Sequence, residues 1–135
     1  MRAITTNIDI VRAHYAASAQ GNIEAMMAHV SAQVRWTEMA GFPCAGTWVG
    51  PKSVVDNVFT VLGRDWIGYH FELESLIDGG DQVVGVGAYH GTNRVTGKEM
   101  QARVAHVWKL QDGKIAAFEQ FTDTLLVNQA MNNAK

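Results

Sequence analysis

The spacing of apolar residues changes along this chain, and the change restricts the folds open to it. Near the N-terminus, Ile8, Val11 and Tyr15 recur at the three- to four-residue interval of a helix. From Trp66 onward, apolar and polar residues alternate, as in strands that bury one face. Helices followed by a meander of strands predict an α+β fold, in which N-terminal helices cover one face of a curved antiparallel β-sheet.

Local signals give bounds for these elements. We expect a first helix that Thr6 or Asn7 caps and Gly21 stops, because glycine adopts a left-handed conformation without a Cβ clash. Asn22 then caps a second short helix that carries Ile23 to Val30. The remaining elements are a strand at 34–38, a loop at 41–50, a third helix from Pro51 that Gly63 ends, strands at 66–77, 82–90, 100–110 and 115–122, and a short helix within 123–134.

The 135 residues fit a single domain, 1–135. Apolar residues make up 47% and charged residues 18%, which is typical of a globular chain rather than a disordered one. The formal net charge of −2 argues against nucleic-acid partners and against electrostatic docking to a membrane. No stretch reaches the roughly 20 apolar residues of a membrane helix, the first residues do not resemble a signal peptide, and Cys44 is the only cysteine. We therefore expect a cytoplasmic protein.

Motifs for cofactors and metals are missing from the sequence. It contains neither a glycine-rich phosphate loop nor a dinucleotide fingerprint. The histidines form no pair at metal-binding helical spacing with a carboxylate between them. Ser53 lacks the context of a nucleophilic serine, and Cys44 is either a nucleophile or a small loop residue. We therefore expect no cofactor and no metal.

Three local motifs occur in order along the chain. They are Tyr15 six residues before Gly21-Asn22, the segment Gly46-Thr-Trp48-Val-Gly50-Pro51, and an ending that runs from His106-Val-Trp108 through Asp112-Gly113 to Phe121-Thr-Asp123. Together with the order of elements, they resemble the nuclear transport factor 2-like superfamily, and within it the branch of SnoaL-like polyketide cyclases and ketosteroid isomerases. The resemblance implies a cone-shaped sheet around a deep apolar pocket, a small apolar ligand and a homodimer.

Glu38 is the first candidate for a catalytic group. It shares a strand face with Val34 and Trp36, and a carboxylate on an apolar face is costly unless it is hydrogen-bonded or functional. Burial would raise its pKa toward neutrality, as suits a general base or acid. The resemblance places Glu38 where ketosteroid isomerases carry a proton-shuttling aspartate. The alternative is a carboxylate at a strand end that faces water.

Three further side chains are candidates because of the resemblance. His106 corresponds approximately to the oxyanion-hole acid of ketosteroid isomerases, although it could equally be a hydrogen-bonded histidine of the core. Asp123 resembles the acid/base of SnoaL-like cyclases, but aspartate at this boundary is also a natural helix cap. Tyr15, rather than its neighbour His14, belongs to the apolar stripe of the first helix, and its hydroxyl could donate to an enolate oxygen.

Bulky side chains could form the walls of the pocket, or simply the core. The substrate-binding candidates are Trp36, Phe42, Trp48, Phe59, Trp108 and Phe121. The loop that carries Phe42 and Cys44 could cover the mouth.

These residues support several functions. The first is cofactor-free proton transfer, as in an isomerase or an aldol-type cyclase, on an apolar cyclic or polyketide-like carbonyl compound. A second is a small-molecule-binding module of the same fold without catalysis. An epoxide hydrolase similar to limonene epoxide hydrolases ranks lower, because Arg35 and Arg103 have outward parity on their strands. A protein-interaction domain is the remaining alternative.

Overall fold

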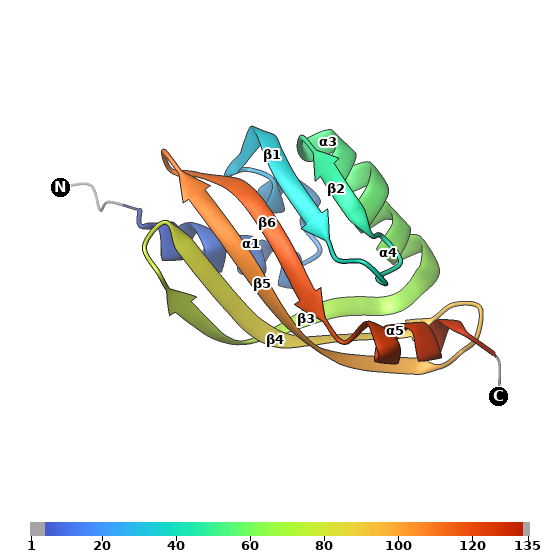
Figure 1. The fold of residues 1–135 in the computed structure, drawn as a ribbon. Coiled ribbons are helices and arrows are strands. Elements are labelled where there is room, and N and C mark those ends of the chain that lie inside the picture. The colour runs from blue at the N-terminus through green and yellow to red at the C-terminus, as the bar shows by residue number, and fades with distance from the viewer. Residues whose placement is uncertain (1–4, 134–135) are drawn as a thin grey trace.

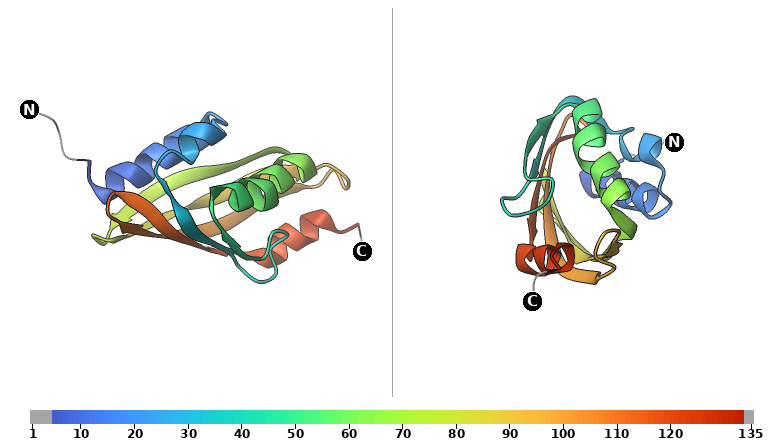
Figure 2. Two further views of the ribbon diagram at one scale, coloured as in Figure 1. Left: turned by 90° about the horizontal axis from the view of Figure 1, so that it is seen from above. Right: turned by 90° about the vertical axis from the view of Figure 1, so that its right-hand side faces the viewer.

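The computed structural model describes residues 5–133 and consists of a curved sheet with the helices that precede Trp66 on one of its faces, while the C-terminal helix lies apart from them (Figures 1 and 2). The helical segments are α1 (Asn7–Ala19), α2 (Ile23–Met26), α3 (Pro51–Val54), a π-helical turn (Val55–Phe59), α4 (Thr60–Asp65) and α5 (Thr124–Met131). The strands are β1 (Val30–Glu38), β2 (Gly46–Val49), β3 (Trp66–Asp78), β4 (Gln82–Asn93), β5 (Glu99–Gln111) and β6 (Lys114–Thr122). The predicted α+β class is confirmed.

Short capping motifs set the ends of the N-terminal helices. The Thr6 side chain accepts a hydrogen bond from the Asp9 backbone, and Asp9 accepts one from the Thr6 backbone, so Thr6 closes a capping box at α1. Gly21 follows α1 with a φ of +67°, and the Asn22 side chain caps α2. The predicted stop and the predicted second cap are both confirmed.

The sheet has the strand order β2-β1-β6-β5-β4-β3. All neighbours are antiparallel except β1 and β6, which run parallel with Trp36 beside Phe118. This pairing places the first strand beside the last one, and because they run parallel, the carboxyl ends of both lie side by side (Figure 1). Glu38 therefore lies near the end of β6.

Three predicted bounds are wrong. The expected loop at 41–50 contains β2, in which Thr47 pairs with Thr37 and their hydroxyls are 2.9 Å apart. The second helix ends at Met26, and Val30 begins β1 instead. The third helix continues past Gly63 to Asp65, and one π turn interrupts it. Short edge strands and π turns leave no regular spacing in a sequence, so periodicity does not reveal them.

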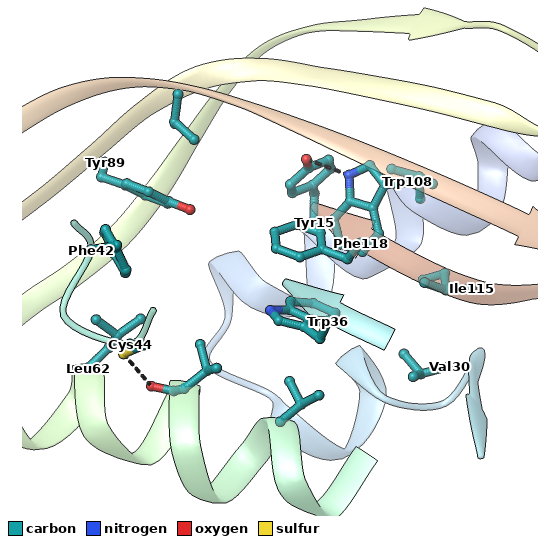
Figure 3. Packing of buried hydrophobic residues seen from close by; sticks show 14 of the residues in the cluster. Tyr15, Val30, Trp36, Phe42, Cys44, Leu62, Tyr89, Trp108, Ile115 and Phe118 are labelled. Carbon is teal, nitrogen blue, oxygen red and sulfur yellow. Dashed lines mark hydrogen bonds between the residues drawn. The ribbon is translucent and has the colours of Figure 1, made fainter. Parts of the chain in front are cut away.

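The core lies between the helices and the inner face of the sheet (Figure 3). On β5, every second residue from Met100 to Leu110 is buried, as the alternation predicts. The inner face also carries three buried polar side chains, Glu38, His106 and Gln120, each at most 5% exposed. Because buried polar groups require partners or a function, these three residues define where to look for a site.

Candidate functional site

A cavity of about 290 Å³ opens between the helices and the inner face of the sheet. Side chains from α1, α2, the π turn, α4 and every strand except β2 surround it, and most of them are apolar or aromatic. Its lining includes His14, Tyr15, Met26, Trp36, Glu38, Val58, Phe59, Leu62, Tyr69, Phe71, Tyr89, His106, Trp108 and Phe118. A concave apolar space with a few polar groups is typical of a small-molecule site.

Glu38 contributes the only carboxyl group to the described lining of this cavity. It is 4% exposed, and its Oε2 atom has no hydrogen-bond partner among residues 5–133. Burial raises the pKa of Glu38 to about 8, and the indole of Trp36 acts against that rise. The carboxyl is therefore mostly protonated at neutral pH, and it changes charge within one unit of that pH.

His106 occupies the centre of a hydrogen-bond network on the inner face. Its Nδ1 lies 2.8 Å from the Tyr15 hydroxyl, and its Nε2 lies 2.7 Å from the Tyr89 hydroxyl. The Trp108 indole donates to Tyr15 over 2.8 Å, and the Gln120 amide donates to Tyr89 over 2.8 Å. Burial lowers the pKa of His106 to about 3, so the imidazole is neutral. Both ring nitrogens have a tyrosine partner, which places His106 behind the two tyrosines rather than free in the cavity.

Gly85 explains how Tyr15 reaches His106. The two residues Gly85 and His106 are directly opposite each other on β4 and β5. A Cβ atom on Gly85 would lie 2.2 Å from the Tyr15 hydroxyl, so any larger residue would displace the tyrosine. The missing side chain on β4 thus makes room for a side chain from α1.

His14 also lines the cavity, which the sequence did not suggest. It is 6% exposed, its Nδ1 donates to the Met26 carbonyl oxygen over 2.9 Å, and its ring contacts Trp108 edge-on. Burial lowers the pKa of His14 to about 4. Both His14 and Tyr15 therefore line the cavity, although the apolar stripe of the first helix favours Tyr15 alone.

Asp123 lies outside the cavity. Its side chain is exposed and accepts a hydrogen bond from the Leu126 backbone over 3.2 Å, so it caps α5. The capping interpretation accounts for this residue, and we assign it no part in the cavity's chemistry.

The expected wall residues divide into two groups. Trp36, Phe59 and Trp108 line the cavity. The other three, Phe42, Trp48 and Phe121, do not: Phe42 packs behind Tyr89, the Trp48 indole donates to the Cys44 carbonyl, and Phe121 is 45% exposed.

Two tyrosines of the cavity were missed at the sequence level. Tyr69 on β3 and Tyr89 on β4 lie near each other, with ring centroids 5.3 Å apart. The sequence carried a signal for Tyr89, since it has the same parity as Gly85 and therefore faces the same side as His106. Tyr69 and Phe71 have the same parity and lie on one face of β3. The irregularity at Gly68 shifts the register at the start of the strand, so the sequence alone does not show which face that is.

The other reactive side chains that the structure describes between residues 5 and 133 form no second site. Cys44 is buried, its thiol faces the Val58 carbonyl of the π turn, and burial raises its pKa to about 12, which suppresses the nucleophilic thiolate (Figure 3). Arg35 and Arg103 do not line the cavity, and Arg103 pairs with Glu74. Within residues 5–133, no three metal-binding side chains are grouped together.

The match to a family model covers most of the cavity. The model of the SnoaL-like domain matches residues 11–118, a range that includes Tyr15, Glu38, Tyr89 and His106. The chain belongs to the SnoaL-like domain family. This family is part of the nuclear transport factor 2-like superfamily, so the resemblance of the three motifs is confirmed.

Solved structures with this fold align over nearly the whole chain. A nuclear transport factor 2-like protein from Burkholderia thailandensis is 56% identical, with a TM-score of 0.93 over 98% of this chain and 99% of that one. TerC, co-crystallised with polyporic acid, is 23% identical, with a TM-score of 0.81 over 93% and 97%. A putative SnoaL-like polyketide cyclase from Jannaschia sp. is 17% identical, with a TM-score of 0.82 over 100% and 99%.

At 23% and 17% identity, TerC and the Jannaschia protein show only that this SnoaL-like chain has the same fold. A comparison with curated proteins gave no match. Among the described helices, none is long and apolar enough to cross a membrane.

Proposed function

We propose that this SnoaL-like protein catalyses cofactor-free proton transfer next to the carbonyl of an apolar cyclic or polyketide-like compound, with Glu38 as the proton-carrying group. The observation that supports this proposal is the Glu38 carboxyl, which lines an apolar cavity with one oxygen unpartnered. A buried acid with a pKa of about 8 changes charge close to neutral pH, so it can both accept and release a proton there.

The proposed reaction needs only the side chains of the cavity. Ionised Glu38 removes a proton from the carbon next to the carbonyl, and the electron pair of the broken C–H bond moves onto the carbonyl oxygen as an enolate. Protonated Glu38 then returns the proton to carbon, at the same or another position, or the enolate carbon attacks a second carbonyl. A nearby hydroxyl donor would stabilise the negative oxygen, and such a donor contributes about 2.7–4 kcal/mol when well placed.

The size of the cavity favours a small ligand. At about 290 Å³ it is nearly twice the roughly 150 Å³ of an engineered cavity that binds benzene. We therefore propose ligands of one or two rings. The aromatic walls formed by Trp36, Trp108 and Phe118 suit a flat molecule, and these rings meet at edge or stacked geometries.

Exchange of carbon-bound protons tests the proposal without knowledge of the natural substrate. A panel of one- and two-ring ketones is incubated with the protein in D₂O, and loss of the α-proton signal is followed by NMR. We expect exchange above the buffer rate, and a decrease of at least about 100-fold in Glu38→Gln, which keeps the shape but cannot ionise. Glu74→Gln is the matched control, because that carboxylate pairs with Arg103 outside the cavity.

Equal exchange rates in Glu38→Gln and the wild type would refute the role of Glu38. Binding of ketones without any exchange would support the second candidate, a binding module of the same fold. One observation favours that candidate: the neutral form of Glu38 that dominates at pH 7 can donate a hydrogen bond to a carbonyl without chemistry.

A further inference from the structure

The hydrogen-bond network behind the cavity has a donor at each end. The Trp108 indole has an N–H and no acceptor, so it donates to the Tyr15 oxygen. At the other end, the Gln120 amide oxygen accepts from the Met39 backbone over 3.3 Å, which leaves its NH₂ group to donate to Tyr89. Both tyrosine oxygens therefore already accept one hydrogen bond from outside the central imidazole.

The central imidazole allows two arrangements. Neutral His106 has one N–H group and one lone pair. Since each of its nitrogens meets a tyrosine hydroxyl, one tyrosine donates to the ring and the other accepts from it. The tyrosine that accepts from the ring has a hydroxyl hydrogen left over, and that hydrogen needs another acceptor.

The surroundings of the two hydroxyls differ, and the difference selects one arrangement. The Tyr15 hydroxyl lies against the backbone of Gly85, where no further acceptor among the described residues bonds to it. The Tyr89 hydroxyl extends from β4 toward the interior space (Figure 3), where the Tyr69 side chain lies beside it and also lines the cavity. An unsatisfied buried hydroxyl is costly, so Tyr15 uses its hydrogen on Nδ1, and Nε2–H donates to Tyr89.

We propose that Tyr89 donates a hydrogen bond to a ketone or enolate oxygen of the ligand, at the end of a chain in which every hydrogen bond points from Trp108 toward the cavity. The chain runs from the Trp108 N–H through Tyr15 and His106 to Tyr89. Hydrogen bonds aligned in one direction polarise one another, which makes the last hydroxyl a stronger donor than an isolated tyrosine. His106 is thus a positioning residue, while Tyr89 contacts the ligand.

This inference rests on the proposed function, because it places an oxyanion donor near the acid that takes the proton. Glu38 and Tyr89 both line the same cavity, so acid and donor face one space. A ligand oxygen at Tyr89 would bring its adjacent carbon toward Glu38. The donor and the base then act on neighbouring atoms of one carbonyl compound.

The first test measures the tautomer of His106 in the ligand-free protein. Two-bond ¹H–¹⁵N correlation spectra at pH 7 distinguish a protonated from a bare ring nitrogen, and ring-to-backbone correlations assign the signals. We expect a neutral ring with the proton on Nε2 and a bare Nδ1. A proton on Nδ1, or a charged ring, would overturn the direction of the chain. Glu74→Gln is the control and leaves the tautomer unchanged, because that carboxylate pairs with Arg103 outside the cavity.

The second test uses 1-tetralone, a two-ring ketone, as the probe. Its infrared carbonyl band moves to lower frequency when a donor binds the oxygen. We expect this shift with the wild-type protein, its loss in Tyr89→Phe, and about three- to tenfold weaker binding in that variant. Absence of a shifted band in the wild type, or a band that Tyr69→Phe abolishes and Tyr89→Phe preserves, would overturn the assignment.

The two proposals fail in different ways. The proposed function is refuted if proton exchange is unchanged in Glu38→Gln. The donor assignment is refuted if the proton of His106 is on Nδ1, or if the shifted carbonyl band persists in Tyr89→Phe. If Tyr89→Phe fails to fold because Gln120 loses its partner, the tautomer measurement on the wild-type protein still decides the direction of the chain.

Discussion

Glu38 and His106 are buried to nearly the same extent, 4% and 5% exposed, on the inner face of one sheet. Their surroundings are opposite. Both nitrogens of His106 have a hydroxyl partner, whereas Oε2 of Glu38 has none among the described residues. A satisfied buried group holds its neighbours in place, and an unsatisfied one retains the capacity to bind or react. Burial alone therefore does not distinguish a positioning residue from a reactive one, but the count of partners does.

The pH dependence of proton exchange is the strongest test of whether Glu38, rather than His106, is the reactive group. If Glu38 is the base, the rate follows its ionised fraction, which rises from about 1% at pH 6 to about half at pH 8. We expect the exchange rate to increase about 50-fold over that range and to level off at higher pH. A rate that stays constant from pH 6 to pH 8 would show that Glu38 is not the base.

Glu38 and the two buried histidines of the cavity should change the free energy of unfolding with pH in opposite directions. The pKa of Glu38 is raised in the folded state, so the free energy of unfolding falls by ~1.4 kcal/mol per unit as pH rises from about 4.5 to about 8. The pKa values of His106 and His14 are lowered, so each contributes the opposite slope below pH 6.5, down to about pH 3 and pH 4 respectively. The net effect is maximal stability near pH 6.5.

Urea unfolding at pH 5, 6.5 and 8 measures these slopes. In Glu38→Gln, the free energy of unfolding should no longer fall between pH 6.5 and 8, whereas in the wild type it should. A wild-type stability that is flat from pH 6.5 to 8 would show that Glu38 reaches solvent in the folded protein.

Gly85→Ala tests the hydrogen-bond network around His106. The added methyl group would overlap the Tyr15 hydroxyl, so Tyr15 must move away from Nδ1. We expect a loss of about 1–3 kcal/mol in the free energy of unfolding, measured with urea. Gly63→Ala is the control, because the space around Gly63 is open, and there alanine should be neutral or slightly stabilising. Equal stability of Gly85→Ala and the wild type would contradict the packing described for Tyr15.

Asp123 differs from Glu38 in being an exposed carboxylate, and its substitution should have the smallest effect. Its carboxylate is exposed and caps α5, so Asp123→Ala should cost about 1 kcal/mol of stability while Asp123→Asn retains the cap. Thermal unfolding and the proton exchange assay together check this expectation. A large loss of exchange in Asp123→Asn would return this residue to the catalytic candidates.

Much of the fold could be predicted because its signals are local. Alternation on β5, the glycine at the end of α1 and the proline that starts α3 each follow from a few neighbouring residues. Glu38 could be identified for the same reason, since its parity with Trp36 puts both on the inner face. The two short elements that were missed, β2 and the π turn, are stabilised by their neighbours rather than by their own sequence.

The rest of the site depends on contacts between distant segments. Whether Asp123 faces the cavity or caps α5 depends on where β6 ends, which parity does not determine. The role of Tyr89 requires the register of three strands and the space left by Gly85. His14 lines the cavity through contacts with Met26 and Trp108, which come from other segments of the chain. Such features arise from tertiary packing, which a single sequence does not encode in any short pattern.

The parallel pairing of β1 with β6 has a consequence for how the molecule assembles. Trp36 gains its neighbour Phe118 only when the last strand has docked, so we expect the Glu38 carboxyl to be shielded from water only after β6 has paired with β1. Closing a loop between the ends of a chain is a slow event in folding. The abnormal titration of Glu38 would therefore emerge late during refolding, and its appearance would report the moment at which the protein becomes complete.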